Sequence, residues 1–362
     1  MAAAASITLR AVNVHARRLT AQLLAGAPAR DPLDVAERLL AIQGQDPRGA
    51  RLAIRARTAG VTGADIDHEL TEERSLVITT LNRGTLHLIR SVDYPLLQSL
   101  TTPPLFTTSA TRLAQDGIDA HMTSRAMTVI ERSITEEGPL TRGALRDRLQ
   151  RAGVPNLKDA MIHLIFRASI EGRIVRGPMA GRQHAFALVR DWLPDARPPD
   201  RDTALAELAR RYLIGHGPAS DRDLARWAGI GLRDARAGLT AIAGRLRQLP
   251  GDLVELTGRG RAGRLPPPRL LGAFEPLLLG WIGRQAVLGA DHTKIVNGGM
   301  FRGFALVDGR AAADWRLHGS TVAIEPFAPI SDTAAAALAR DGEAVTRFLG
   351  VATNAAQTSS VL

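Results

Sequence analysis

The sequence of 362 residues contains no cysteine, and aromatic residues make up only 4% of it. Without cysteine the chain has no disulfide, no thiolate nucleophile and no cysteine-ligated zinc or iron–sulfur site. With so few aromatic side chains, the core must be built from Leu, Val, Ile and Ala, which favours helices. Apolar residues at 45% and charged residues at 23% are typical of a globular protein.

Long apolar runs and common cofactor motifs are also missing. No run of 18 or more apolar residues occurs, and the opening residues lack the apolar segment of a signal peptide, so we expect a cytoplasmic protein. The sequence contains no His-Glu-x-x-His signature and no phosphate-binding loop, and His292 and His318 lack the spacing of metal ligands. We therefore expect neither a metal nor a cofactor.

Lysine is almost absent, whereas arginine is abundant. Lys158 and Lys294 are the two lysines among 46 basic residues, which leaves 44 arginines, and the formal net charge is +10. An excess of positive charge suits a polyanionic partner such as DNA, although many basic proteins bind no nucleic acid specifically.

An internal repeat occurs in the middle of the chain. The segments EEGPLTRGALRDRL (136–149) and GHGPASDRDLARWA (215–228) share a Gly-Pro pair, a hydroxyl residue and a leucine at the same spacing. Gly-Pro ends one helix, and Thr141 or Ser220 can N-cap the next. After the first copy a helical pattern runs to Gly172 and an alternating pattern then predicts a β-hairpin, which together indicate a winged helix. Residues 125–190 hold twelve basic and six acidic residues, and Arg173 and Arg176 are candidates for DNA contact.

The N-terminal segment predicts a third such unit. DPLDVAERLLAIQG predicts a helix with Asp31 as N-cap, and LVITTLNRGTLHLI (76–89) predicts a hairpin around Asn82-Arg83-Gly84. From residue 266 a proline run precedes strands joined by Asp308-Gly309, which we interpret as a small antiparallel barrel or sheet. The fold class is therefore α+β and mainly helical. It comprises winged-helix units at 1–120, 121–200 and 201–265, a β-barrel at 266–350 and a disordered tail at 351–362.

Two glutamines flank a glycine where the first predicted helix stops. Gln43 continues the apolar stripe of Val35 and Leu39, and Gly44 in a left-handed conformation would end the helix and leave Gln45 just outside it. In one interpretation Gln43 binds a free carbonyl of its own helix end and Gln45 is a solvated loop residue. In the other, both amides face one cleft and hold a water molecule. Spacing alone does not decide between them.

Several separated segments resemble the AlkZ-type winged-helix DNA glycosylases of actinobacteria. They are LLAIQGQDPRGARLAIRAR, LNRGTLHLIRSVDYPLL, GPASDRDLARWAGI, RLLGAFEPLLLGW and GMFRGFALVDGRAAADWRL. The resemblance spans about residues 10–350 and implies three tandem winged helices and a β-barrel that form a concave DNA-binding scoop. It also implies that Gln43 and Gln45 match the catalytic Gln-x-Gln motif, although the family prefers a larger aliphatic residue between them. A related branch has Gln-x-Asp, which Asp46 misses by one position.

The resemblance further implies an activity and a partner. The family removes bulky N7-alkylated purines from double-stranded DNA, and some members unhook interstrand cross-links as self-resistance to a genotoxic natural product. Because neither lysine lies near the motif in sequence, we expect a monofunctional enzyme without lyase activity, unless the fold brings Lys294 close. Tandem units and a barrel in one chain favour a monomer. Asp46, followed by Pro47, is interpreted as a turn or cap residue rather than as a base.

Other polar residues are candidates for contact with DNA, each with a plainer alternative. Asn82 and Arg83 at the hairpin tip suit phosphate contact or are solvated turn residues, and His87 faces DNA or packs within its strand. Lys294, Asn297 and Arg302 resemble a family loop that approaches the minor groove, or they belong to an ordinary surface hairpin. A non-catalytic winged-helix regulator or a lesion sensor remains the alternative function, although regulators of that kind usually dimerise.

Overall fold

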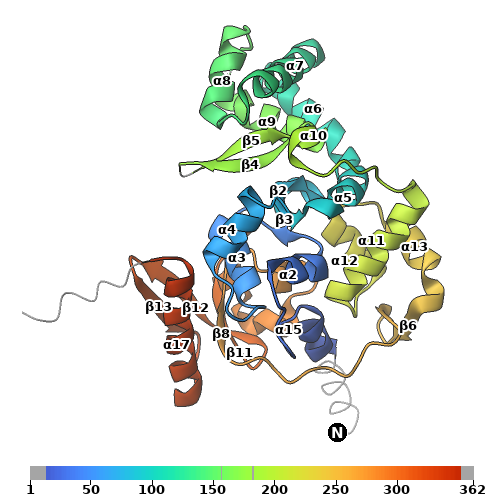
Figure 1. Cartoon of the computed structure of the whole chain (residues 1–362). Coiled ribbons are helices and arrows are strands. Elements are labelled where there is room, and N and C mark those ends of the chain that lie inside the picture. The colour runs from blue at the N-terminus through green and yellow to red at the C-terminus, as the bar shows by residue number, and fades with distance from the viewer. Residues whose placement is uncertain (1–13, 156, 182, 352–362) are drawn as a thin grey trace, which may run out of the picture. The chain divides into compact units, whose positions relative to one another are not determined.

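The computed structural model describes residues 14–155, 157–181 and 183–351 of the chain (Figure 1). Contacts divide the chain into two compact units. Unit 1 holds residues up to 66, 210–224 and 243 onward, and unit 2 holds residues 67–209 and 225–242. The predicted disordered tail falls almost wholly outside the described residues.

Unit 1 combines short helices with small antiparallel sheets. Residues 14–21 are helical. The other elements are α2 (Pro32–Leu39), β1 (Ile42–Gln43), α3 (Pro47–Arg55), β6 (Leu246–Leu249), β7 (Leu253–Leu256), β8 (Arg269–Leu271), α14 (Pro276–Leu279), α15 (Gln285–Leu288), α16 (His292–Ile295), β9 (Val296–Asn297), β10 (Met300–Phe301), β11 (Phe304–Val307), β12 (Arg310–His318), β13 (Thr321–Pro326) and α17 (Asp332–Phe348).

Of the barrel or sheet expected after residue 266, the structure shows a sheet: four strands form one antiparallel sheet, and β9 and β10 form a separate pair. The order of the four strands is β13-β12-β11-β8, so among the described residues β13 and β8 are the two edges. Asp308 and Gly309 take φ values of 50° and 77° and close the β11–β12 hairpin, as the Asp-Gly pair predicts. Helix α17, which the sequence analysis did not anticipate, begins at the N-cap Ser331 and packs on β8 and β13 (Figure 1).

Unit 2 contains two hairpins and the longer helices. Its elements are β2 (Leu76–Leu81), β3 (Thr85–Arg90), α5 (Tyr94–Thr101), α6 (Phe106–Gln115), α7 (Ala120–Glu137), α8 (Arg142–Arg151), α9 (Leu157–Ile170), β4 (Ile174–Ala180), β5 (Gln183–Leu188), α10 (Val189–Trp192) and α13 (Leu232–Ala241). Helices α4 (Gly63–Thr71), α11 (Arg201–His216) and α12 (Asp221–Ala228) cross the boundaries between the units. Helices α7, α8 and α9 enclose an aliphatic core completed by Phe186 and Leu188 of β5.

The repeated capping residues occupy the predicted positions. Thr141 caps α8 by accepting a hydrogen bond from the Ala144 amide at 3.2 Å, and Ser220 accepts one from the Asp223 amide at 3.1 Å. The hairpins at 76–89 and 174–188 are also confirmed. The compact units do not coincide with the four segments expected from the sequence, and the winged-helix identity of those segments stays a prediction. No helix within the described ranges is long and apolar enough to cross a membrane.

The first predicted helix ends earlier than its apolar pattern suggests. Helix α2 stops at Leu39, and Leu40, not Gly44, takes the positive φ, at 63°. Every residue from Leu39 to Gly44 is buried. A helix at the surface buries one face only, whereas an extended strand can bury successive side chains on both faces. The continuous burial therefore fits strand β1 in place of the further turn predicted for α2.

A buried ion pair lies at the centre of unit 1. Arg57, two residues beyond α3, binds Glu275 with 2.5 Å between Nη2 and Oε1, and both side chains are fully buried. The Arg57 guanidinium also donates to the carbonyls of Gln22 and Ala53 at 2.7 and 2.8 Å. Gln22 in turn donates to the Gly215 carbonyl at 2.8 Å. Four chain segments therefore meet at one polar cluster.

We expect Glu275→Leu to lower the free energy of unfolding by about 3–5 kcal/mol, because it leaves the Arg57 charge buried without a counterion. The double variant Arg57→Leu/Glu275→Leu should recover much of that loss, since no uncompensated charge remains. Urea unfolding measures both effects. Arg30→Ala, which removes the exposed Arg30–Asp34 pair, is the control and should change stability little. A single variant as stable as wild type contradicts the central role of this pair.

Candidate functional site

The two glutamines of the Gln-Gly-Gln segment differ sharply in exposure. Gln43, at the end of β1, is only 7% exposed, whereas Gln45 lies in the exposed bend that leads into α3. One amide is thus held inside unit 1 and the other reaches solvent. Such a pair suits the binding of one molecule at the surface of unit 1, by a buried amide and an exposed amide.

Helix α3 begins directly after the glutamines and is capped at its first turn. Asp46 is its N-cap, with Oδ1 accepting a hydrogen bond from the Gly49 amide at 2.7 Å, and Pro47 occupies the first helical position. The capping role expected for Asp46 is therefore confirmed. Gly49 packs against the backbone of Ala273, where a Cβ atom would come within 2.2 Å of the Ala273 carbonyl oxygen. That close approach fixes the start of α3, and with it the segment that carries the glutamines.

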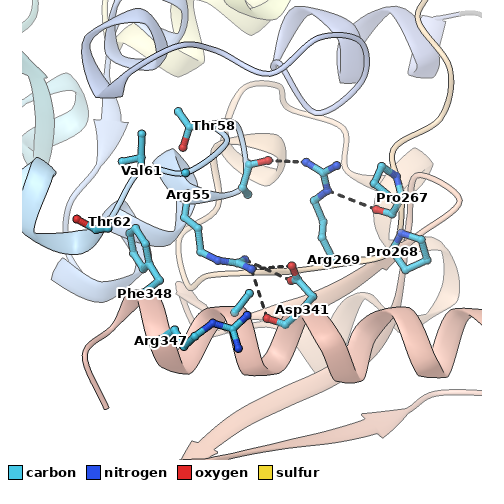
Figure 2. Close-up of a pocket in the computed structure, with 13 residues that line it drawn as sticks. Arg55, Thr58, Val61, Thr62, Pro267, Pro268, Arg269, Asp341, Arg347 and Phe348 are labelled. Atoms are coloured by element: carbon cyan, nitrogen blue, oxygen red, sulfur yellow. Dashed lines mark hydrogen bonds and ion pairs between the residues drawn. The ribbon is translucent and has the colours of Figure 1, made fainter. Parts of the chain in front are cut away.

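The other end of α3 is held by an ion pair to α17. Arg55 binds Asp341 with 2.6 Å between Nη2 and Oδ1, and Asp341 also accepts the Leu270 amide at 2.7 Å (Figure 2). Both residues line a hollow of about 440 Å³ beside Arg269. Arg269 donates to the carbonyls of Ala56 and Pro267, so these two arginines already have partners within the fold (Figure 2). The hollow therefore has the character of a structural junction.

Asn82 and Arg83 lie at the tip of the β2–β3 hairpin, as predicted, but neither is a solvated turn residue. Asn82 is fully buried, and neither atom of its side-chain amide has a hydrogen-bond partner. Arg83 takes a φ of 58° and donates to the Trp227 carbonyl, with Gly229 packed against its backbone. A buried amide without partners costs free energy, and such groups often belong to functional sites.

His87 is packed inside its strand and is neutral. It is 2% exposed, lies opposite Thr79 in the hairpin, and its Nδ1 lies 2.9 Å from the Thr85 carbonyl. Burial, helped by the positive charge of Arg83, lowers the pKa of His87 to about 3. At neutral pH this imidazole carries no charge toward DNA.

Lys294, Asn297 and Arg302 are exposed residues on or beside a tight hairpin. Strands β9 and β10 pair around Gly298 and Gly299, whose φ values of 56° and 83° suit a two-residue turn. The ammonium of Lys294 lies 4.6 Å from the centre of the Phe327 ring. The surface-hairpin expectation is confirmed, and contact with DNA stays a prediction.

The two arginines of the second hairpin are held by other side chains. Arg173 pairs with Glu131 and Glu171 at 2.7 and 2.5 Å, and Arg176 stacks on Phe186 at 4.7 Å. Desolvation and the nearby Arg142 lower the pKa of Arg176. Arg173 is thus neutralised within the fold, which makes Arg176 the better candidate of the two for an anionic partner.

Within the described ranges no group of three His, Asp or Glu side chains is arranged to hold a metal ion.

Comparison with known proteins places the chain in a family. The family model described as "DNA glycosylase AlkZ-like" matches residues 36–348. The chain belongs to the AlkZ-like DNA glycosylase family. The Streptomyces sahachiroi DNA glycosylase AlkZ has a similar fold, with a TM-score of 0.77 and 22% sequence identity over 94% of this chain and 96% of that one. No curated sequence matches the chain significantly.

Membership of the AlkZ-like family gives the general activity. The chain is a DNA glycosylase, its substrate is DNA, and the resemblance noted in the sequence is confirmed. The likeness to AlkZ itself is a likeness of fold.

Sequence patterns did not single out two residues that shape the site. Arg57 and Glu275 carry no motif, and their pairing joins residues 218 positions apart.

Asn82→Leu tests whether the orphaned amide is reserved for function. We expect the free energy of unfolding to stay unchanged or rise by up to about 1 kcal/mol, because no hydrogen bond is lost. Base release should slow if the amide serves the substrate, as we expect. Thr79→Val is the matched control, because it removes a buried hydroxyl of the same hairpin that also has no hydrogen-bond partner. This variant should leave the rate of base release unchanged. A stability loss of about 2 kcal/mol or more in Asn82→Leu argues for a structural role instead.

Proposed function

We propose that this chain is a monofunctional DNA glycosylase that hydrolyses the N-glycosidic bond of bulky N7-alkylated purines. Gln43 and Gln45 position the attacking water. The observation that carries the proposal is the Gln-Gly-Gln segment itself. It has one amide buried and one exposed, and it stands directly before a helix fixed by a cap, a backbone contact and ion pairs.

The chemistry of the lesion explains why amides suffice. Alkylation of N7 places a positive charge on guanine, so the base leaves as a neutral molecule and the glycosidic bond is already weak. The enzyme needs little general-base assistance. It must hold a water beneath C1′ and favour oxocarbenium-like charge, which is mainly a matter of positioning. An amide both donates and accepts hydrogen bonds and keeps its charge state at every relevant pH.

The placement of other reactive groups supports a mechanism in which the amides only position the water. Asp46 uses Oδ1 to cap α3, which favours a structural role over that of a base. A lyase needs an amine near the sugar to form a Schiff base. Lys294 packs over Phe327 and Lys158 is an exposed residue of α9. We therefore propose that the product is an intact abasic site.

The substrate is proposed to include bulky adducts and interstrand cross-links, as in self-resistance to a genotoxic natural product. Support comes from the family resemblance and from the few aromatic residues. An enzyme that extrudes a base normally stacks it on aromatic side chains, and only 4% of this chain is aromatic. Tandem winged helices arranged as a concave scoop around the duplex are part of the same proposal. So is a monomeric enzyme in which Asn82, Lys294, Asn297 and Arg302 serve contact with DNA, whereas His87 packs within its strand.

Single-turnover release of base from a duplex with one N7-methylguanine or nitrogen-mustard adduct tests the proposal. Gln45→Ala and Gln43→Ala should each slow release about a hundredfold at equal DNA occupancy, because the water loses a positioning group. Gln45 is exposed, so its variant changes no core packing. Gln248→Ala, at an exposed position on β6, is the matched control and should react like wild type.

The product distinguishes the proposal from its alternatives. Wild type should leave an alkali-labile abasic site, and borohydride should trap no covalent protein–DNA adduct. A trapped adduct contradicts the monofunctional mechanism. Wild type that binds both lesions tightly without releasing base contradicts catalysis on this substrate class.

A further inference from the structure

A second hollow in unit 1 has an unusual charge balance. It has a volume of about 280 Å³ and is lined by four arginines and one carboxylate: Arg17, Arg38, Arg259, Arg261 and Glu255. Thr20 and short backbone segments complete the lining. The lining side chains carry a net charge of three positive units, since four arginines face one glutamate.

The single carboxylate is already neutralised. Glu255 is fully buried and accepts hydrogen bonds from Arg17, at 3.0 and 3.1 Å, and from Arg247, at 2.9 Å. Two guanidinium groups therefore share one negative charge. One carboxylate cannot balance the four arginines of the hollow, although Glu255 partly offsets the charge on Arg259.

Within the described residues, no carboxylate forms a close ion pair with Arg38, Arg259 or Arg261, although Asp34 and Glu255 act on Arg38 and Arg259 at longer range. Arg259 donates to the backbone carbonyls of Gly217 and Ile214 at the end of α11, which orients the guanidinium without neutralising it. In the part of the chain that the structure describes, neither Arg38 nor Arg261 forms a hydrogen bond or ion pair through its side chain. Desolvation and the positive charge of Arg38 lower the pKa of Arg259 to about 10. A bound anion would relieve this repulsion.

We propose that the hollow formed by Arg17, Arg38, Arg259 and Arg261 is a binding site for a phosphate group. Planar guanidinium groups match the oxygens of phosphate in pairs, and a half-buried hollow strengthens each contact relative to open surface. The group comes either from the backbone of DNA or from a free phosphate. The first source rests on the DNA-directed function of this family. Arg38 belongs to the last turn of α2, five residues before Gln43, so a phosphate held there lies on the element that leads into the glutamine segment.

The DNA source is tested by the salt dependence of binding to an undamaged duplex, measured by fluorescence anisotropy. The double variant Arg38→Gln/Arg261→Gln should weaken binding about tenfold. It should also reduce the slope of log affinity against log salt by about 1, as expected for one lost phosphate contact. Arg261→Gln alone alters only an exposed side chain and should show part of the effect. Arg347→Gln, at an exposed arginine of α17, removes one positive charge elsewhere and is the control for Arg261→Gln.

The free-phosphate source is tested by the thermal unfolding midpoint in sodium phosphate against sodium chloride of equal ionic strength. A free phosphate is identified by two results together. Phosphate raises the unfolding midpoint of wild type and of Arg347→Gln but not that of the double variant, and the salt slope of DNA binding is the same in the double variant as in wild type. A changed DNA slope identifies the backbone. If the double variant matches wild type in both measurements, the proposal is overturned.

These measurements are independent of the catalytic proposal. Binding to an undamaged duplex requires no base release, so a wild type that fails to release alkylated purine leaves the salt slope interpretable. The arginines contribute to binding, whereas the glutamines act on the bond.

Discussion

The buried contact between Arg57 and Glu275 is the constraint on which the rest of unit 1 depends. Removing two full charges from water is costly, and the cost is offset only when every remaining donor and acceptor has a partner. Here Gln22, Ala53 and the Leu277 amide supply those partners. The pair therefore specifies one arrangement of the N-terminal helix, α3 and α14. Because α3 starts at the glutamine segment and ends beside Arg57, this arrangement also sets where the two amides lie.

The glutamine segment owes its geometry to an early end of a helix. Leu40 turns at positive φ, the next residues are buried as an extended strand, and Asp46 then starts α3. Gln43 is thereby held inside while Gln45 reaches solvent. Two uncharged amides suit a reaction in which the substrate already carries the positive charge and the protein supplies orientation rather than a proton acceptor.

Local patterns predicted local features well, and long-range contacts remained hidden. The N-caps Asp31, Thr141 and Ser220 and the Asp308-Gly309 turn are specified by neighbouring residues, so the sequence revealed them. The end of α2 was misplaced because a continuous apolar run fits both a buried helix and a buried strand, and packing against the rest of the unit decides between them. The strand order of the sheet, helix α17 and the arginine-lined hollow depend on which segments meet, and a single sequence carries no signal for that.

The central claim is that neutral amides position the water and that no titrating base activates it. The pH dependence of single-turnover release from N7-methylguanine DNA tests this claim most directly. The lowered pKa values of His87 and His216 mean that the unfolded chain binds more protons below pH about 6.5. Stability therefore falls as the pH falls, and the folded fraction is recorded by circular dichroism at each point. If neutral amides position the water, the rate for the folded enzyme is flat from pH about 5 to about 9. A rate that falls about tenfold per pH unit below a single pKa in that range would contradict this claim, because it would identify a general base.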